Sequence, residues 1–130
     1  MCMGVHTVFV YGTLRKGQPN RAVMEPHLVA DLGEGQIRGA MYDLGPFPAV
    51  TLEEDGVVTG EWVRVTDEGL ARLDRLEGYP SFYDRAIVSD TANGLHGWVY
   101  WMARQKVDGY ERVESGDWAK HLEQKMALRR

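Results

Sequence analysis

Short apolar runs separated by turn residues extend along the chain as far as residue 103 and predict strands rather than long helices. The first run predicts a buried strand over residues 7–11, followed by a loop over 12–19. Gly-Pro-Phe-Pro and Glu-Asp-Gly segments predict turns further on, because Gly and Pro interrupt regular structure. The later strands are predicted over residues 34–44, 48–52, 57–65, 82–89 and 95–103.

The segment DEGLARLDRLE has the spacing of an amphipathic helix, with leucines three residues apart and acidic residues in the first turn. Gly78 and Pro80 follow this segment, as expected where a helix ends on a left-handed glycine before a proline. We therefore predict a helix over residues 67–77 whose apolar face contains Leu70, Leu73 and Leu76.

Two further helices complete the predicted elements. A short one begins near Asn20, a residue type that favours the N-cap, and a last one begins near Ser115. No internal repeat, low-complexity segment or linker divides the sequence. We therefore expect a single domain over residues 1–130 of the α+β class, built on a small curved sheet or barrel.

Composition narrows the class of protein. With 130 residues, 44% hydrophobic and 26% charged, the chain is long enough for one core and too apolar for a disordered protein. A net charge of −4 argues against nucleic acid as the main partner, because binding phosphates needs clustered Lys and Arg. Neither a membrane-spanning run nor the apolar core of a signal peptide is found. We expect a cytoplasmic protein that is a monomer or a weak dimer.

Cysteine and histidine give no indication of metal or redox chemistry. Cys2 is the single cysteine, so it cannot form an internal disulfide, and nothing around it indicates a reactive thiol. A structural zinc site needs about four clustered ligands, whereas the four histidines are scattered along the chain. We therefore predict no metal ion and no cofactor. The histidines are His6, His27, His96 and His121.

The segment VFVYGTLRKGQPN passes abruptly from a buried strand to a polar turn. Gly12 in this segment lets a ligand approach the backbone closely. Successive N–H groups in such a loop, here Tyr11–Leu14, form a concave site suited to a carboxylate or a phosphate. A glycine at a strand end is also a common structural feature, and the nucleotide-binding glycine patterns are absent. The loop alone therefore indicates a binding site without identifying the ligand.

Glu77 stands where a helix favours an apolar or a basic residue. It follows Leu73 by four residues on the apolar face, and it lies at the helix C-terminus, where the dipole opposes a negative charge. Both effects raise the pKa of a carboxyl group, and a raised pKa makes a useful base near neutral pH. The alternative is a structural ion pair with Arg85 or Arg15. Asp74, one turn earlier, is interpreted as a partner of one of these arginines rather than as a second catalyst.

The segments FVYGTLRKGQPN and LARLDRLEGYPSFYDR, with GAMYDLGPFPAV between them, resemble the γ-glutamylcyclotransferase-like superfamily. The resemblance is strongest to γ-glutamylamine cyclotransferases and AIG2-like proteins and covers residues 8–102, within a core of about 7–103. It implies a small mixed, mainly antiparallel β-barrel with flanking helices and no cofactor. It also implies that Glu77 is the general acid/base. The residues that it implies bind the glutamyl group, largely through backbone N–H groups, are Tyr11, Gly12, Thr13 and Leu14.

The activity implied by this resemblance is an intramolecular cyclisation of a γ-glutamyl amine or peptide. The substrate's α-amine attacks its own γ-carbonyl, so that 5-oxoproline forms and the attached amine leaves. Such a reaction needs orientation and one acid/base but no covalent nucleophile, which agrees with the absence of a Ser-His or Cys-His set. Tyr42, Tyr83 and Phe47 are candidates to line the pocket, although such residues are also common in cores. Arg15 is a candidate to add charge at the carboxylate site, or else a surface residue.

A non-catalytic module that binds glutamate-like or γ-glutamyl ligands is the alternative, because a fold does not fix a function. Glu77 favours the enzyme, since a carboxylate-binding site gains nothing from a buried negative charge. Glutathione, γ-glutamyl dipeptides, γ-glutamyl-lysine and acylated biosynthetic amines all present the same glutamyl end. The sequence thus predicts a small-molecule γ-glutamyl substrate and leaves its amine open.

Overall fold

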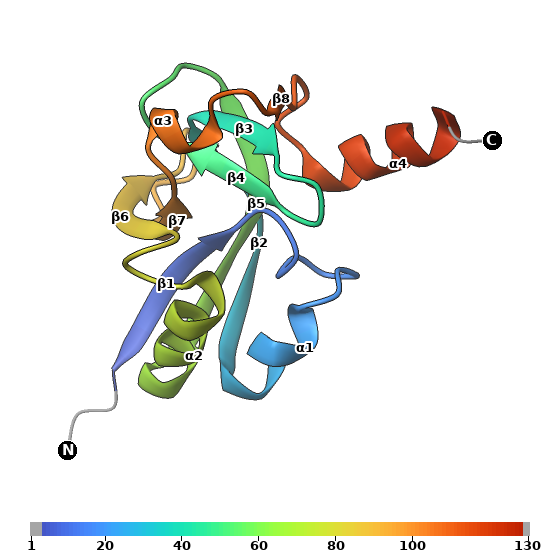
Figure 1. The fold of residues 1–130 in the computed structure, drawn as a ribbon. Coiled ribbons are helices and arrows are strands. Elements are labelled where there is room, and N and C mark those ends of the chain that lie inside the picture. Colours follow the sequence, from blue (N-terminus) through green and yellow to red (C-terminus); the bar gives the residue numbers. More distant parts are fainter. Residues whose placement is uncertain (1–3, 129–130) are drawn as a thin grey trace.

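A computed structural model of the chain describes residues 4–128, so Cys2 lies outside the described part. The strands are β1 (Val5–Val10), β2 (Leu28–Arg38), β3 (Ala40–Asp43), β4 (Pro48–Thr51), β5 (Val57–Thr66), β6 (Asp84–Ser89), β7 (His96–Trp101) and β8 (Glu111–Arg112). They form a five-stranded sheet in the order β2-β5-β1-β7-β6 and a three-stranded sheet in the order β4-β3-β8 (Figure 1).

The helices are α1 (Arg21–Met24), α2 (Asp67–Glu77), α3 (Arg104–Val107) and α4 (Trp118–Leu128), with a 3₁₀ turn η1 (Glu25–His27) after α1. In Figure 1, α1 and α2 lie at one end of the larger sheet and the smaller sheet lies at the other end. Helix α4 is joined to β3, because His121 Nε2 and Lys125 Nζ each lie 2.8 Å from Asp43 Oδ2. Within residues 4–128, no helix has the length and apolar character that crossing a membrane requires.

Strand β1 is the middle strand of the larger sheet. It pairs antiparallel with β5 and parallel with β7, and the other described strand pairs are antiparallel. Its Val8, Phe9 and Val10 are buried. The N–H of Met102 donates to Val50 O at 2.9 Å, which ties the end of β7 to the smaller sheet around a common core. The predicted α+β class with mixed, mainly antiparallel strands is confirmed.

Helix α2 has the predicted bounds because local signals define both of its ends. Thr66 Oγ1 accepts the Gly69 N–H at 3.1 Å as the N-cap. Gly78 adopts the left-handed conformation, and its N–H donates to Arg75 O at 3.2 Å. Leu70 and Leu73 are buried as predicted. Leu76 is 41% exposed, so the prediction that it belongs to the buried apolar face is wrong.

The single strand predicted over residues 34–44 is wrong, because this stretch contains the end of β2 and all of β3, which belong to different sheets. Gly39 separates them with a φ of 152°, a conformation that favours glycine and lets the chain leave one sheet for the other. Strand β2 also begins earlier, at Leu28. Its first half contains Asp31 and Gly33. An edge strand tolerates these residues, but they interrupt the run of apolar residues from which a strand is predicted.

Helix α1 begins at Arg21, directly after the predicted N-cap residue, whereas the start of the last helix differs from the prediction. Asn20 precedes α1, but its side chain caps no N–H group and instead donates to Thr13 Oγ1 at 2.9 Å. The last helix begins at Trp118 rather than near Ser115. Asp117 is the residue whose carboxylate accepts a first-turn N–H there, at 3.1 Å. Helix α3 and strand β8 were not predicted, because runs of four and two residues are too short to produce a periodic pattern.

Candidate active site

A cavity of about 200 Å³ opens between the end of β1 and the C-terminal end of α2. It brings together the two features singled out in the sequence, the Tyr11–Leu14 loop and Glu77. The smaller sheet contributes one wall through the start of β4. The lining residues are Phe9, Val10, Tyr11, Gly12, Thr13, Leu14, Asn20, Phe47, Pro48, Leu76, Glu77, Phe82, Tyr83 and Tyr100.

The Tyr11–Leu14 loop has backbone donors that the fold does not use. Within residues 4–128, the N–H groups of residues 12–14 have no hydrogen-bond acceptor. The carbonyls of the loop are occupied, since Gly12 O and Thr13 O accept N–H groups from later residues at 3.1 and 2.9 Å. The loop is therefore fixed through its acceptors and keeps consecutive donors available for an anion such as a carboxylate.

Glu77 is the last residue of α2 and is half-buried at the cavity wall. Within the described range, its carboxyl group has neither a hydrogen bond nor an ion pair. Burial raises the pKa of Glu77 to about 7, because loss of water disfavours the charged form. The helix terminus acts in the same direction. Near neutral pH both protonation states are populated, which suits a group that must accept and then return a proton.

The arginines that the alternative assigned to Glu77 have other partners. Arg85 donates to Asp74 through Nε at 3.0 Å and Nη2 at 3.3 Å, which confirms Asp74 as the partner of an arginine. The guanidinium of Arg85 also lies over two aromatic rings, with centroid distances of 4.4 and 4.2 Å. Arg15 pairs with two other carboxylates at 3.1 Å each. The structural ion pair is therefore not present among the described residues.

Three tyrosine hydroxyls join the walls of the cavity. Tyr11 OH donates to Tyr100 O and Tyr83 OH donates to Pro48 O, both at 2.7 Å. Tyr100 OH donates to Asp74 Oδ1 at 2.7 Å, which links β7 to α2. Burial is the largest cause that raises the pKa of each of these phenols, so all three stay protonated at neutral pH. These hydroxyls hold the loop, the smaller sheet and the helix at fixed positions around Glu77.

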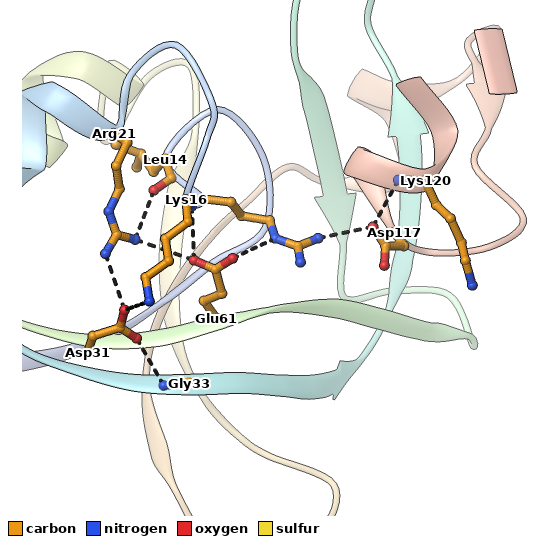
Figure 2. Close-up of polar contacts among 9 residues, drawn as sticks. Leu14, Lys16, Arg21, Asp31, Gly33, Glu61, Asp117 and Lys120 are labelled. Atoms are coloured by element: carbon orange, nitrogen blue, oxygen red, sulfur yellow. Dashed lines mark hydrogen bonds and ion pairs between the residues drawn. The ribbon is translucent and has the colours of Figure 1, made fainter. Parts of the chain in front are cut away.

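A cluster of ion pairs supports the Tyr11–Leu14 loop, and Figure 2 shows Glu61 of β5 at the centre of this cluster. The Glu61 carboxylate accepts hydrogen bonds from Arg15 Nε and from the Lys16 N–H, both at 3.1 Å. Arg21 Nη1 donates to it at 3.3 Å and to Leu14 O at 3.4 Å. Both arginines are buried. The cluster is completed by three further carboxylates, those of Glu25, Asp31 and Asp117.

We expect Glu61→Gln to lower the free energy of unfolding by about 1–3 kcal/mol, because two buried arginines lose the carboxylate that they share while each keeps another carboxylate partner. Urea unfolding at pH 7 measures this change. Asp55→Asn is the matched control, since Asp55 pairs with Arg38 at 3.9 Å on a fully exposed surface, and its stability should equal that of the parent. A Glu61→Gln variant as stable as this control would show that the cluster does not support the loop.

Two predicted binding residues lie outside the cavity lining. The guanidinium of Arg15 faces Glu61 and Asp117, because a buried arginine requires carboxylate partners. The Tyr42 hydroxyl donates a hydrogen bond to Glu54 Oε1 at 2.5 Å, and Tyr42 does not line the cavity. Their predicted contact with substrate therefore stays a prediction that the cavity lining does not support. The predicted residues that do line the cavity are Tyr11, Gly12, Thr13, Leu14, Tyr83, Glu77 and Phe47.

Several lining residues were not predicted as such. Asn20 resembled a helix cap, and only the fold shows that its side chain braces Thr13. Tyr100 lies in the strand predicted over residues 95–103, and that prediction did not indicate what its side chain contacts. Leu76 and Phe82 are exposed apolar residues at the cavity opening, and a sequence pattern alone gives no reason to place them there.

Metal ligands are not clustered in the described part of the chain. No group of three or more His, Cys, Asp or Glu side chains within residues 4–128 is arranged to hold a metal ion. His6 and His121 each contact one carboxylate, at 2.6 and 2.8 Å. The cavity offers consecutive backbone N–H groups that the fold does not use and one carboxyl group with a raised pKa, a combination that suits an amino-acid-like ligand.

Comparison with known proteins identifies the class to which this fold and site belong. The family model described as gamma-glutamyl cyclotransferase, AIG2-like, matches residues 8–120. The chain therefore belongs to this family, as the sequence resemblance predicted, and its membership supports γ-glutamylcyclotransferase activity.

Three related proteins illustrate the match. A putative gamma-glutamylcyclotransferase of Vibrio cholerae is 34% identical over 117 residues, which cover 90% of this chain and 98% of the relative. The gamma-L-glutamyl-butirosin B gamma-glutamyl cyclotransferase of Niallia circulans is 33% identical over 88% of this chain and 76% of its own length. The crystal structure of an AIG2-like protein from Mus musculus is 27% identical, with a TM-score of 0.72 over 85% of this chain and 86% of that one.

Proposed function

We propose that this protein cyclises a γ-glutamyl amine, releasing 5-oxoproline and the free amine, with Glu77 as the general acid/base. The supporting observation is one unpaired carboxyl, with its pKa raised to about 7, in the same cavity as the unused N–H groups of residues 12–14. A carboxylate with this pKa can deprotonate an ammonium group, and the amides can bind an α-carboxylate. These are the two charged groups of a glutamyl moiety.

The proposed reaction exchanges one carbon–nitrogen bond for another. Glu77 removes a proton from the α-ammonium group, and the free amine attacks the γ-carbonyl carbon to form the ring bond. The electron pair of the bond that breaks passes to the leaving nitrogen. Over the whole reaction the α-nitrogen loses two protons and the leaving nitrogen gains two, so charge is conserved and the Glu77 carboxylate is regenerated. Glu77 transfers these protons from one nitrogen to the other.

The walls of the cavity supply the orientation that this cyclisation needs. The hydroxyls of Tyr11, Tyr83 and Tyr100 fix the positions of the loop, the smaller sheet and α2 relative to one another. A substrate anchored through its α-carboxylate is then folded so that its own amine meets its γ-carbonyl. Intramolecular orientation of this kind is equivalent to an effective concentration of about 10⁵ M or more. No covalent nucleophile from the protein is required.

The test is release of 5-oxoproline from γ-glutamyl-methylamide, measured by chromatography with and without a chelator such as EDTA. We expect turnover, and we expect the same rate after exhaustive chelation, because the described residues contain no metal-binding cluster. Saturable binding of the amide without any product would favour the non-catalytic binding module. A large loss of rate on chelation that one divalent ion restores would contradict the mechanism.

A further inference from the structure

The opening of the cavity is apolar although solvent reaches it. Phe82 is 49% exposed and Leu76 is 41% exposed, and both line the cavity. The Phe82 ring packs edge-to-face with Phe47, which also lines the cavity, at a centroid distance of 5.9 Å. Single exposed apolar residues are ordinary, but two of them that line one cavity together with the partly buried Phe47 form an apolar surface that favours apolar contact. We call Leu76, Phe47 and Phe82 the apolar mouth.

The segment that carries Phe82 is fixed to the end of the helix that carries Glu77. The Phe82 N–H donates to Gly78 O at 2.8 Å. Lys106 Nζ donates to Ser81 O and to Phe82 O, at 2.7 and 3.0 Å. Two of the three donors of the Lys106 ammonium group are therefore used by backbone carbonyls. An apolar surface that is already ordered costs little further entropy when a ligand contacts it.

The charges around the cavity favour some leaving groups over others. Within the described residues, no Lys or Arg lines the cavity, and Glu77 is its only acidic residue. A carboxylate on the leaving group would lose water there without gaining a cationic partner from the lining. The ammonium groups of a polyamine would have only one acidic partner in the lining, Glu77, which is also the proposed proton-transferring group. An uncharged apolar substituent meets neither penalty.

The position of Glu77 places the leaving group at this surface. Glu77 must reach the leaving nitrogen to return a proton, and the preceding residue, Leu76, belongs to the apolar mouth. The cavity of about 200 Å³ is smaller than the roughly 300–1,000 Å³ of pockets for drug-sized ligands. A glutamyl group anchored on residues 12–14 therefore leaves the substituent of the nitrogen to extend outward over Phe82.

Building on the proposed function, we propose that the apolar mouth is the subsite for the leaving amine and that it selects amines with an uncharged alkyl or aryl substituent. Amino acids, dipeptides and polyamines are expected to be poorer leaving groups on this enzyme. The preference arises from apolar contact at Phe82 and Leu76 and from the absence of a cation along the described lining.

The test is a series of γ-glutamyl amides from methyl to n-butyl, compared with γ-glutamylglycine and glutathione by 5-oxoproline release. Full burial of a methylene is worth about fourfold in binding, and the mouth is half-exposed, so kcat/KM should rise about twofold for each added methylene. The butylamide should exceed γ-glutamylglycine by at least about tenfold, because the carboxylate of glycine has no partner.

Two variants test whether the rise in kcat/KM per methylene depends on the apolar mouth. Phe82→Ser should reduce the gain to nearly none per methylene, whereas Ile87→Ser should keep the parental slope, because Ile87 is 56% exposed on β6 away from the cavity. A flat series in the parent, a steep one in Phe82→Ser, or γ-glutamylglycine as good as the butylamide would each overturn this inference alone. If no amide yields 5-oxoproline, the proposed function itself fails, which is a distinct result.

Discussion

Glu77→Gln is expected to lower kcat for 5-oxoproline formation by about 10²–10⁴-fold, the usual effect of losing a positioned acid/base. Glutamine keeps the size of the side chain but cannot accept the proton of the α-ammonium group. Binding of 5-oxoproline, which has no ammonium group, should stay within a few-fold of the parent. Glu68→Gln is the matched control, because Glu68 lies on the same helix with its side chain 88% exposed. A parental kcat in Glu77→Gln would show that another group transfers the proton.

The stability of the same variant gives a second measurement with a defined sign. Burial raises the folded-state pKa of Glu77 from 4.5 to about 7, so the fold favours the neutral acid. The stabilisation is fully present below pH 4.5 and is lost as the pH rises through about 7. Its size is about 3 kcal/mol at most. Glutamine is neutral throughout, so urea unfolding should find the variant more stable than the parent at pH 8. A destabilised variant would instead indicate a buried ion pair.

Gly12→Val is expected to raise the KM for γ-glutamyl amides, and the Kd for 5-oxoproline, by about 10- to 100-fold. A Cβ at Gly12 would lie 2.6 and 2.8 Å from Cγ and Cδ of Pro48, so the loop or the start of β4 must move. Pro48 O also accepts the Tyr83 hydroxyl, and its displacement would disturb a second wall. The loss corresponds to one hydrogen bond to a charged group, which is worth about 1.5–3 kcal/mol.

Two comparisons separate this effect from a general loss of structure. Gly94→Val places a side chain where φ is 78° and where no atom lies within 4 Å, so it adds backbone strain far from the cavity. Its KM should equal that of the parent. Thr13→Ala should raise KM less than Gly12→Val does, because its backbone amide is retained. A folded Gly12→Val protein with parental KM would mean that the carboxylate binds elsewhere.

The local parts of this structure could be predicted because short-range rules decide them. Helix α2 has its predicted bounds, since its leucine spacing, its first-turn acids and Gly78 all act within a few residues. The unusual position of Glu77 could also be predicted, because helical spacing places Glu77 on the same face as Leu73 at the end of α2. Asp74 is the partner of an arginine, as predicted, although that arginine, Arg85, lies on β6 and not on the same helix.

The parts that depend on distant segments could not be predicted in this way. The separation of β2 from β3 rests on Gly39, whose φ no periodic pattern reveals. Arg15 pairs with Glu61 of β5, a contact between distant parts of the chain that the position of Arg15 next to the loop did not indicate. Phe82 lines the cavity because its segment folds back onto the end of α2. Such contacts arise only when strands and helices pack together.

The central claim, that Glu77 acts as the catalytic base from a raised pKa, is tested most directly by the pH dependence of kcat/KM for γ-glutamyl-methylamide. The pKa of about 7 predicts that kcat/KM rises about tenfold per pH unit below pH 7 and levels off above it. The residual activity of Glu77→Gln should lack this acid limb. An acid limb near pH 4.5 in the parent, or an unchanged limb near pH 7 in Glu77→Gln, would contradict the assignment.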